Sequence, residues 1–171
     1  LLAMAMFVLV VDTSFMNVSI SAVVEDLNAT VSGVQSAIAL EALVSASFIL
    51  IGSKIGDLYG RKLAYILGLL GYAIAMFIFG LATRFWMLFV ARTFSGVLSS
   101  AAMPTAMAYI SDNLPEDKRG GAMGQLGASV GLGVVLGPLL GGFLSSDSLS
   151  LPFFVGSGLA LFSLLLVFIF L

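Results

Sequence analysis

The sequence predicts an all-α integral membrane protein with six transmembrane helices. Of its 171 residues, 60% are hydrophobic and only 9% are charged, whereas a soluble domain carries roughly 25% charged residues. The apolar stretches are long and apolar on every side, which excludes the alternating segments of ~10 residues that build a transmembrane barrel. A water-facing surface cannot be built from this composition, so lipid must surround most of the chain.

Six stretches have the length of a membrane span, which needs about 20 apolar residues. Short breaks with charged or small polar residues separate them, so we expect a single domain over residues 1–171. The chain begins and ends inside apolar runs, and we therefore expect it to be part of a longer protein. The predicted spans are roughly Leu2–Val24, Val31–Ile51, Leu63–Ala82, Phe85–Ile110, Gly121–Leu144 and Leu151–Leu171.

A short charged segment, Gly52–Lys62, lies between the second and third spans. It holds three of the seven Lys and Arg residues and is punctuated by glycines. A segment this short cannot be a domain. We therefore predict a short basic hinge that joins two membrane spans.

The basic residues predict the orientation, because short cytoplasmic loops are enriched in Lys and Arg. One side of the predicted bundle receives five of these basic residues, and the other side receives only Arg84. We therefore expect the protein to lie in a cell membrane with both ends of these 171 residues, and the two basic loops, on the cytoplasmic side. The five are Lys54, Arg61, Lys62, Lys118 and Arg119.

The loop before the fifth span has the features of a helix start. Pro115 suits a first helical turn, and Glu116 and Asp117 are favourable at the positive end of a helix dipole. We expect a short surface helix that leads into the fifth span.

The sequence argues against an enzyme and against a resident metal or cofactor. It has no Cys and no His, so thiolate, zinc and haem sites are not expected. It also shows no nucleophile–base constellation and no phosphate-binding loop, and nothing indicates a nucleic-acid partner.

Three ionisable residues lie inside predicted spans: Asp12, Glu41 and Arg92. A charge at the bilayer centre costs at least ~2.5–3.5 kcal/mol, so such residues usually face a cavity or a partner. Each could simply hold two helices together, and Arg92, near the outer end of its span, could snorkel to the interface. Alternatively, a desolvated carboxylate could take up and release a proton, which proton coupling requires.

The fifth span carries two series of glycines spaced four residues apart. Gly127 and Gly131 form one, and Gly133, Gly137 and Gly141 the other. Such small-residue stripes let neighbouring helices approach closely. Pro138 removes a backbone hydrogen bond and should bend the helix.

These motifs resemble the major facilitator superfamily, and specifically its 14-span drug:proton antiporter branch. The resemblance covers the first six spans of that fold. Asp57, Gly60, Arg61 and Lys62 match the signature loop between spans two and three, and Asp12 and Asn17 match a span-one motif of the branch. Leu88, Arg92 and Gly96 match the span-four pattern, with Ser95 in place of Gln. The span-five antiporter pattern is complete as Gly133, Gly137, Pro138, Gly141 and Gly142.

The resemblance implies a fold and a set of roles. The six spans would be a 3+3 inverted repeat and one half of a transporter. Asp12, Asn17 and Arg92 would line the site of proton coupling and substrate binding. Glu41, a further carboxylate within the membrane, is expected at the same site. Arg61 would pair with Asp112, whereas Asp57 would have no partner in this chain because its family partner lies in the second half.

Three functions are compatible with these features. The span-five pattern favours a proton-coupled exporter of drugs or other small amphipathic or cationic compounds. Glu41, where the branch usually has an aromatic residue, indicates a cationic substrate or a second proton site. An uptake symporter of the same fold is the first alternative, and a membrane anchor or interaction domain is the second. The second half would follow in the same chain or come from a homodimer.

Overall fold

The computed structural model describes residues 1–11, 23–24, 28–145, 148 and 150–170, and the described part is helical without strands. Five helices are long and apolar enough to cross a membrane, when α4 and α5 are taken together. This confirms the predicted all-α membrane fold, although the internal inverted repeat stays a prediction. The helices are Leu2–Val11, α2 (Val31–Tyr59), α3 (Arg61–Gly80), α4 (Phe85–Ser99), α5 (Ala102–Asn113), α6 (Glu116–Ser145) and α7 (Leu151–Phe170).

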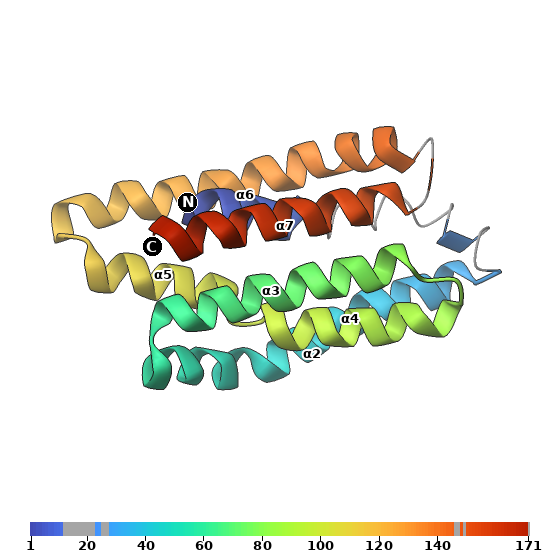
Figure 1. The fold of residues 1–171 in the computed structure, drawn as a ribbon, viewed down its shortest axis with the longest axis horizontal. Coiled ribbons are helices and arrows are strands. Elements are labelled where there is room, and N and C mark those ends of the chain that lie inside the picture. Colours follow the sequence, from blue (N-terminus) through green and yellow to red (C-terminus); the bar gives the residue numbers. More distant parts are fainter. Residues whose placement is uncertain (12–22, 25–27, 146–147, 149, 171) are drawn as a thin grey trace.

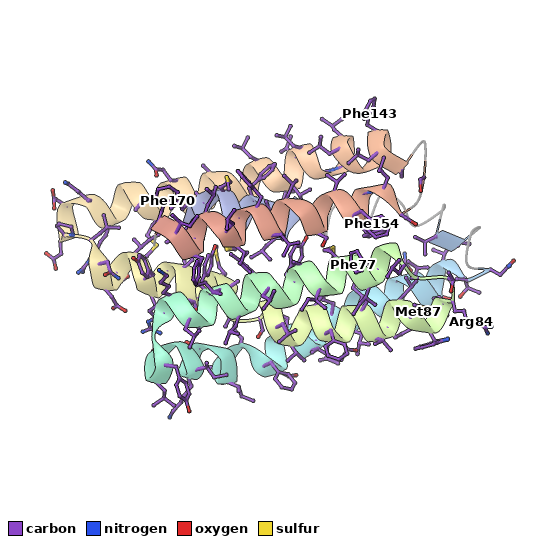
Figure 2. The ribbon with its side chains drawn as sticks, in the orientation of Figure 1. Phe77, Arg84, Met87, Phe143, Phe154 and Phe170 are labelled. Atoms are coloured by element: carbon purple, nitrogen blue, oxygen red, sulfur yellow. The ribbon has the colours of Figure 1, made fainter. Side chains whose placement is uncertain are left out.

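The helices run lengthwise in one bundle and reverse direction at its two ends (Figure 1). The α2–α3 and α5–α6 junctions lie at one end, with the chain's first and last described turns toward it. The α3–α4 and α6–α7 junctions lie at the other end, where Arg84 is labelled (Figure 2). The connectivity therefore gathers the basic junctions at one end, as the sequence predicts, while the side that faces the cytoplasm stays a prediction.

Helix α3 lies at the centre of the packing. It contacts α7 and α4 extensively and α2 and α5 more lightly, and it contributes to both hydrophobic clusters of the core. Two tyrosine hydroxyls on α3 donate to carbonyl oxygens of helix 2–11: Tyr65 to Leu2 at 3.2 Å and Tyr72 to Val8 at 3.3 Å. These bonds satisfy polar groups that lipid could not, and they fix the first helix against α3.

The predicted hinge over Gly52–Lys62 is wrong in its extent. Helix α2 continues through Tyr59, and α3 begins at Arg61, so Gly60 alone separates them. Gly60 has a φ of +100°, which glycine adopts readily. A helix satisfies its own backbone groups, so it continues past the apolar stretch until Gly60 reverses the chain.

The fourth predicted span is interrupted. Helix α4 ends at Ser99 and α5 begins at Ala102. Pro104 explains the break, because a proline ring clashes with the carbonyl four residues earlier, here that of Ser100, and offers no N–H to it. The predicted uninterrupted helix over Phe85–Ile110 is therefore corrected to two helices that meet at a kink.

The surface helix expected to lead into the fifth span is present, but it is not a separate element. Its residues form the first turns of the 30-residue helix α6, which starts at Glu116 and runs continuously through Pro138. The carbonyl of Pro115 accepts hydrogen bonds from the amides of Lys118 and Arg119. A favourable helix start leads directly into the span because nothing in this sequence ends the helix.

One of the two glycine stripes on α6 is a packing surface. Gly133, Gly137 and Gly141 are buried. A Cβ on Gly133 would lie 3.0 Å from the Cβ of Val10 and 3.2 Å from the carbonyl oxygen of Phe7, so helix 2–11 packs closely here. The other stripe, Gly127 and Gly131, faces open space among the described residues.

Candidate functional site

A buried ion pair joins α2 to α4. The guanidinium Nη1 of Arg92 donates to Oε2 of Glu41. Arg92 is fully buried, and the Glu41 side chain is only 13% exposed. The two residues are 51 positions apart, and each compensates a charge that would otherwise be costly within the membrane. Burial of Arg92 also excludes the alternative that its side chain snorkels to the interface.

Helix α4 holds this pair through three residues on one face. Arg92, Ser95 and Gly96 follow the i, i+3, i+4 spacing that places side chains together on a helix. The Ser95 hydroxyl donates to Oε1 of Glu41 at 2.6 Å. A Cβ on Gly96 would lie 2.8 Å from the carbonyl oxygen of Glu41, so the glycine allows the close approach of α2 on which both polar contacts depend.

An aromatic ring of α3 holds the other side of the arginine. The guanidinium carbon of Arg92 lies 4.7 Å from the centroid of the Phe79 ring, within the range of a cation–π contact. Phe79 stacks in turn on Phe153 of α7, with ring centroids 4.8 Å apart. Arg92 is therefore fixed between a carboxylate and a packed aromatic pair.

Glu41 lines a cavity of about 510 Å³. The cavity lies between helix 2–11, α2, α3 and the α4–α5 kink, and its wall is mainly apolar. Glu41 is the one charged residue among the described residues that line it. Three methionines, Met6, Met103 and Met107, contribute adaptable apolar surface.

Two of the residues expected at this site, Asp12 and Asn17, lie outside the described part of the chain. Val11, at the end of helix 2–11, is buried. The participation of Asp12 and Asn17 stays a prediction.

The signature-loop residues form a second cluster at the basic end of the bundle. Nε of Arg61 lies 3.2 Å from Oδ2 of Asp112, which confirms the expected contact. Arg61, the first residue of α3, also pairs with Asp57, four residues earlier near the end of α2. The expectation that Asp57 lacks a partner in this chain is therefore wrong, because α2 extends to Tyr59 and the Gly60 turn brings Arg61 back beside Asp57.

The remaining motif residues occupy structural positions. Gly60 forms the α2–α3 turn, and Lys62 donates from Nζ to the carbonyl oxygen of Phe168 at 3.1 Å, at the C-terminal end of α7. Gly142 and Pro138 are half-buried on α6, beside the buried glycines of the antiporter pattern.

The sequence did not identify Ser95 and Phe79 as parts of the site. Ser95 was noticeable only as a replacement for Gln, and its place one turn from Arg92 was the available signal. Phe79 is one of 14 phenylalanines, and nothing in its neighbourhood distinguishes it.

The comparisons with known proteins agree on the family. The family model of the Major Facilitator Superfamily matches residues 2–171. The chain is 34% identical to the probable actinorhodin transporter of Streptomyces coelicolor, over 78% of this chain and 23% of that protein. It is 34% identical to multidrug resistance protein 2 of Bacillus subtilis, over 74% of this chain and 31% of that protein. It is 33% identical to the class B tetracycline resistance protein of Escherichia coli, over 76% of this chain and 32% of that protein.

A solved structure shows the same fold. A bacterial homologue of the human lysosomal transporter Spinster, in an inward-facing and occupied conformation, superposes with a TM-score of 0.83 at 20% sequence identity. The match covers 98% of this chain and 42% of that one. The chain therefore spans less than half of this structure and 23 to 32% of the three named relatives. It is a multi-pass membrane protein that belongs to the major facilitator superfamily and corresponds to the N-terminal half of that fold.

Proposed function

We propose that this chain is the N-terminal half of a proton-coupled exporter of small amphipathic or cationic compounds. The observation that carries the proposal is the cavity of about 510 Å³ with Glu41 as its one charged lining residue among those described. A cavity with an apolar, methionine-bearing wall and one carboxylate suits an amphipathic cation. The names of the relatives, which include multidrug and tetracycline resistance proteins, support a drug-like substrate.

The geometry suggests how a proton and a substrate would be exchanged. Glu41 lines the cavity, and its two carboxylate oxygens contact Arg92 and Ser95. While Glu41 is ionised, Arg92 balances its charge. When Glu41 takes up a proton, the charge of Arg92 is left unbalanced and repels a cation from the cavity. Asp12 would add a second carboxylate to the same cycle.

Alternating access requires a second six-span half, which rocks against the first around a central site. We propose that it follows in the same chain or is supplied by a homodimer. The basic end of the bundle would face the cytoplasm of a bacterial cell, and the Arg61, Asp57 and Asp112 cluster would stabilise one conformation of the cycle.

The experiment is transport in inverted membrane vesicles that contain the full-length protein. When the vesicle interior is more acidic than the medium, a proton-coupled exporter accumulates ethidium inside the vesicles. Collapse of the gradient with a protonophore then releases the ethidium. An uptake symporter would instead drive ethidium out of the vesicles under this gradient. No gradient-dependent movement of ethidium or of other amphipathic cations would favour the anchor or interaction domain and contradict the proposal.

A further inference from the structure

A second hollow lies on the bundle, apart from the cavity that Glu41 borders. It has a volume of about 300 Å³ and lies between α2, α3 and the α4–α5 kink. Small residues form its floor: Gly52 on α2, Gly68 and Ala64 on α3, and Ala101 at the kink. A Cβ on Gly52 would lie only 2.5 Å from the Cβ of Ala101, so the helices meet closely beneath the hollow.

The rim of this groove is apolar and open. Phe48, Ile51, Leu67 and Leu98 are 38–55% exposed. The one polar side chain among the lining residues is Ser100, whose hydroxyl already donates to the Val97 carbonyl at 2.8 Å. The groove therefore offers shape and apolar contact but no polar group to a solute, which suits a hydrocarbon chain.

A cation lies at the end of the groove nearest the α2–α3 turn. A shallow hollow on α2 shares Ile51 and Ile55 with the groove and is lined further by Leu50, Leu58 and Lys54. Lys54 is exposed and forms no ion pair with a described residue. The other basic residues of this turn are engaged, since Arg61 contacts two carboxylates and Lys62 donates to Phe168.

The residues at the Lys54 end of the groove are of the types found where a bilayer meets water. Tyr59 is 70% exposed just beyond Lys54, and tyrosine is enriched at membrane–water interfaces. A lysine at this depth extends its charge toward the headgroups. The groove and Lys54 therefore complement a phospholipid. The apolar groove would contact the acyl chain, and Lys54 would contact an anionic headgroup at the interface.

We propose that this groove binds one anionic phospholipid, with an acyl chain between α2, α3 and the α4–α5 kink and the phosphate group at Lys54. Charge complementarity selects an anionic headgroup over a zwitterionic one, because Lys54 attracts the net negative charge of the lipid. The bound chain would lie against Gly52 and Ala101, at the junction where α2 meets the kink.

The test is native mass spectrometry of the full-length protein, purified in detergent and titrated with phosphatidylglycerol or phosphatidylcholine of the same acyl chains. The native protein should retain one phosphatidylglycerol about fivefold more tightly than one phosphatidylcholine, as expected for one lysine at the membrane surface. Lys54→Gln should bring this ratio close to one. Lys118→Gln, which removes an exposed charge from the start of α6 at the same end, is the matched control and should leave the ratio unchanged.

A second pair of variants tests the acyl groove. Val97→Phe places a ring in the groove and should weaken retention of both lipids, whereas Val90→Phe, on an exposed position of the same helix outside the groove, should not. Thermal unfolding in detergent establishes that each variant is folded. A phosphatidylglycerol preference that survives Lys54→Gln, or lipid retention that survives Val97→Phe, would overturn the proposal. Absence of lipid retention by the native protein would indicate that the second half or exchanging bulk lipid covers this face, and would overturn it equally.

Discussion

Gly96 of α4 lies directly against the backbone of Glu41 of α2, so closely that a Cβ on the glycine would be 2.8 Å from the Glu41 carbonyl oxygen. The Cβ of Val44 would be 3.1 Å away on the same side. Backbone atoms and a branched side chain cannot move aside locally, so the distance between α2 and α4 depends on this glycine. The contact matters because Arg92 and Ser95, on the same face of α4, reach Glu41 only at this separation.

Gly96→Ala should therefore destabilise the protein and separate Glu41 from its partners. Overpacking of a close contact costs about 1–3 kcal/mol, and we expect a lower unfolding temperature in detergent together with reduced ethidium transport. Gly131→Ala is the control, because a Cβ there meets nothing within 4 Å. Equal unfolding temperatures for the two variants would contradict the close approach of α2 and α4.

The Glu41–Arg92 pair should behave as a coupled unit. Arg92→Gln leaves a buried carboxylate without its cation, and breaking a buried pair costs about 3–5 kcal/mol. Removing both charges with Glu41→Gln and Arg92→Gln should cost less than the sum of the two single changes. Unfolding of all four proteins in detergent measures the coupling, and strictly additive effects would show that the two side chains do not interact.

The Arg61 cluster should contribute little to stability. Asp57 and Asp112 have side chains that are 53% and 55% exposed, and exposed ion pairs are worth about 0–1 kcal/mol. We expect Asp112→Asn to change the unfolding temperature only slightly, yet to reduce transport if this contact stabilises one conformation of the cycle. A large loss of stability would instead assign the cluster a structural role.

The kink at Ser100 and Ala101 should depend on Pro104. Pro104→Ala restores an amide donor to the Ser100 carbonyl and removes the ring clash, so α4 and α5 should become one helix. Because Ser99, Ser100 and Pro104 line the cavity, its shape would change. We expect unchanged or higher thermal stability with lower ethidium transport, and native transport rates in this variant would show that the kink is dispensable.

Much of the fold could be predicted from the sequence because lipid imposes a simple rule. Every spanning segment must satisfy its backbone internally, so long apolar runs become helices. The errors occurred where that rule does not set a boundary. Charged residues did not end α2 at Ile51, because only Gly60 changes the backbone direction, and Pro104 interrupted a run that hydropathy alone would keep intact.

The site was less predictable, because its contacts join distant parts of the chain. Glu41 and Arg92 were each expected to need a partner within the membrane, but hydrophobic periodicity does not specify which helices meet. The Arg61–Asp112 contact could be anticipated only through the resemblance to a family. Phe79 and Ser95 are ordinary residues in sequence, and they become parts of the site only when α3 and α4 bring them beside Arg92.

Coupling of proton movement to substrate movement by Glu41 can be tested by one comparison in vesicles. Full-length protein with Glu41→Gln should fail to accumulate ethidium under a proton gradient but should still exchange labelled for unlabelled ethidium when no gradient is present. Glu116→Gln, an exposed residue in the first turn of α6 outside the cavity, should retain both activities. Gradient-driven accumulation at the native rate by the Glu41→Gln protein would show that Glu41 does not couple the two movements.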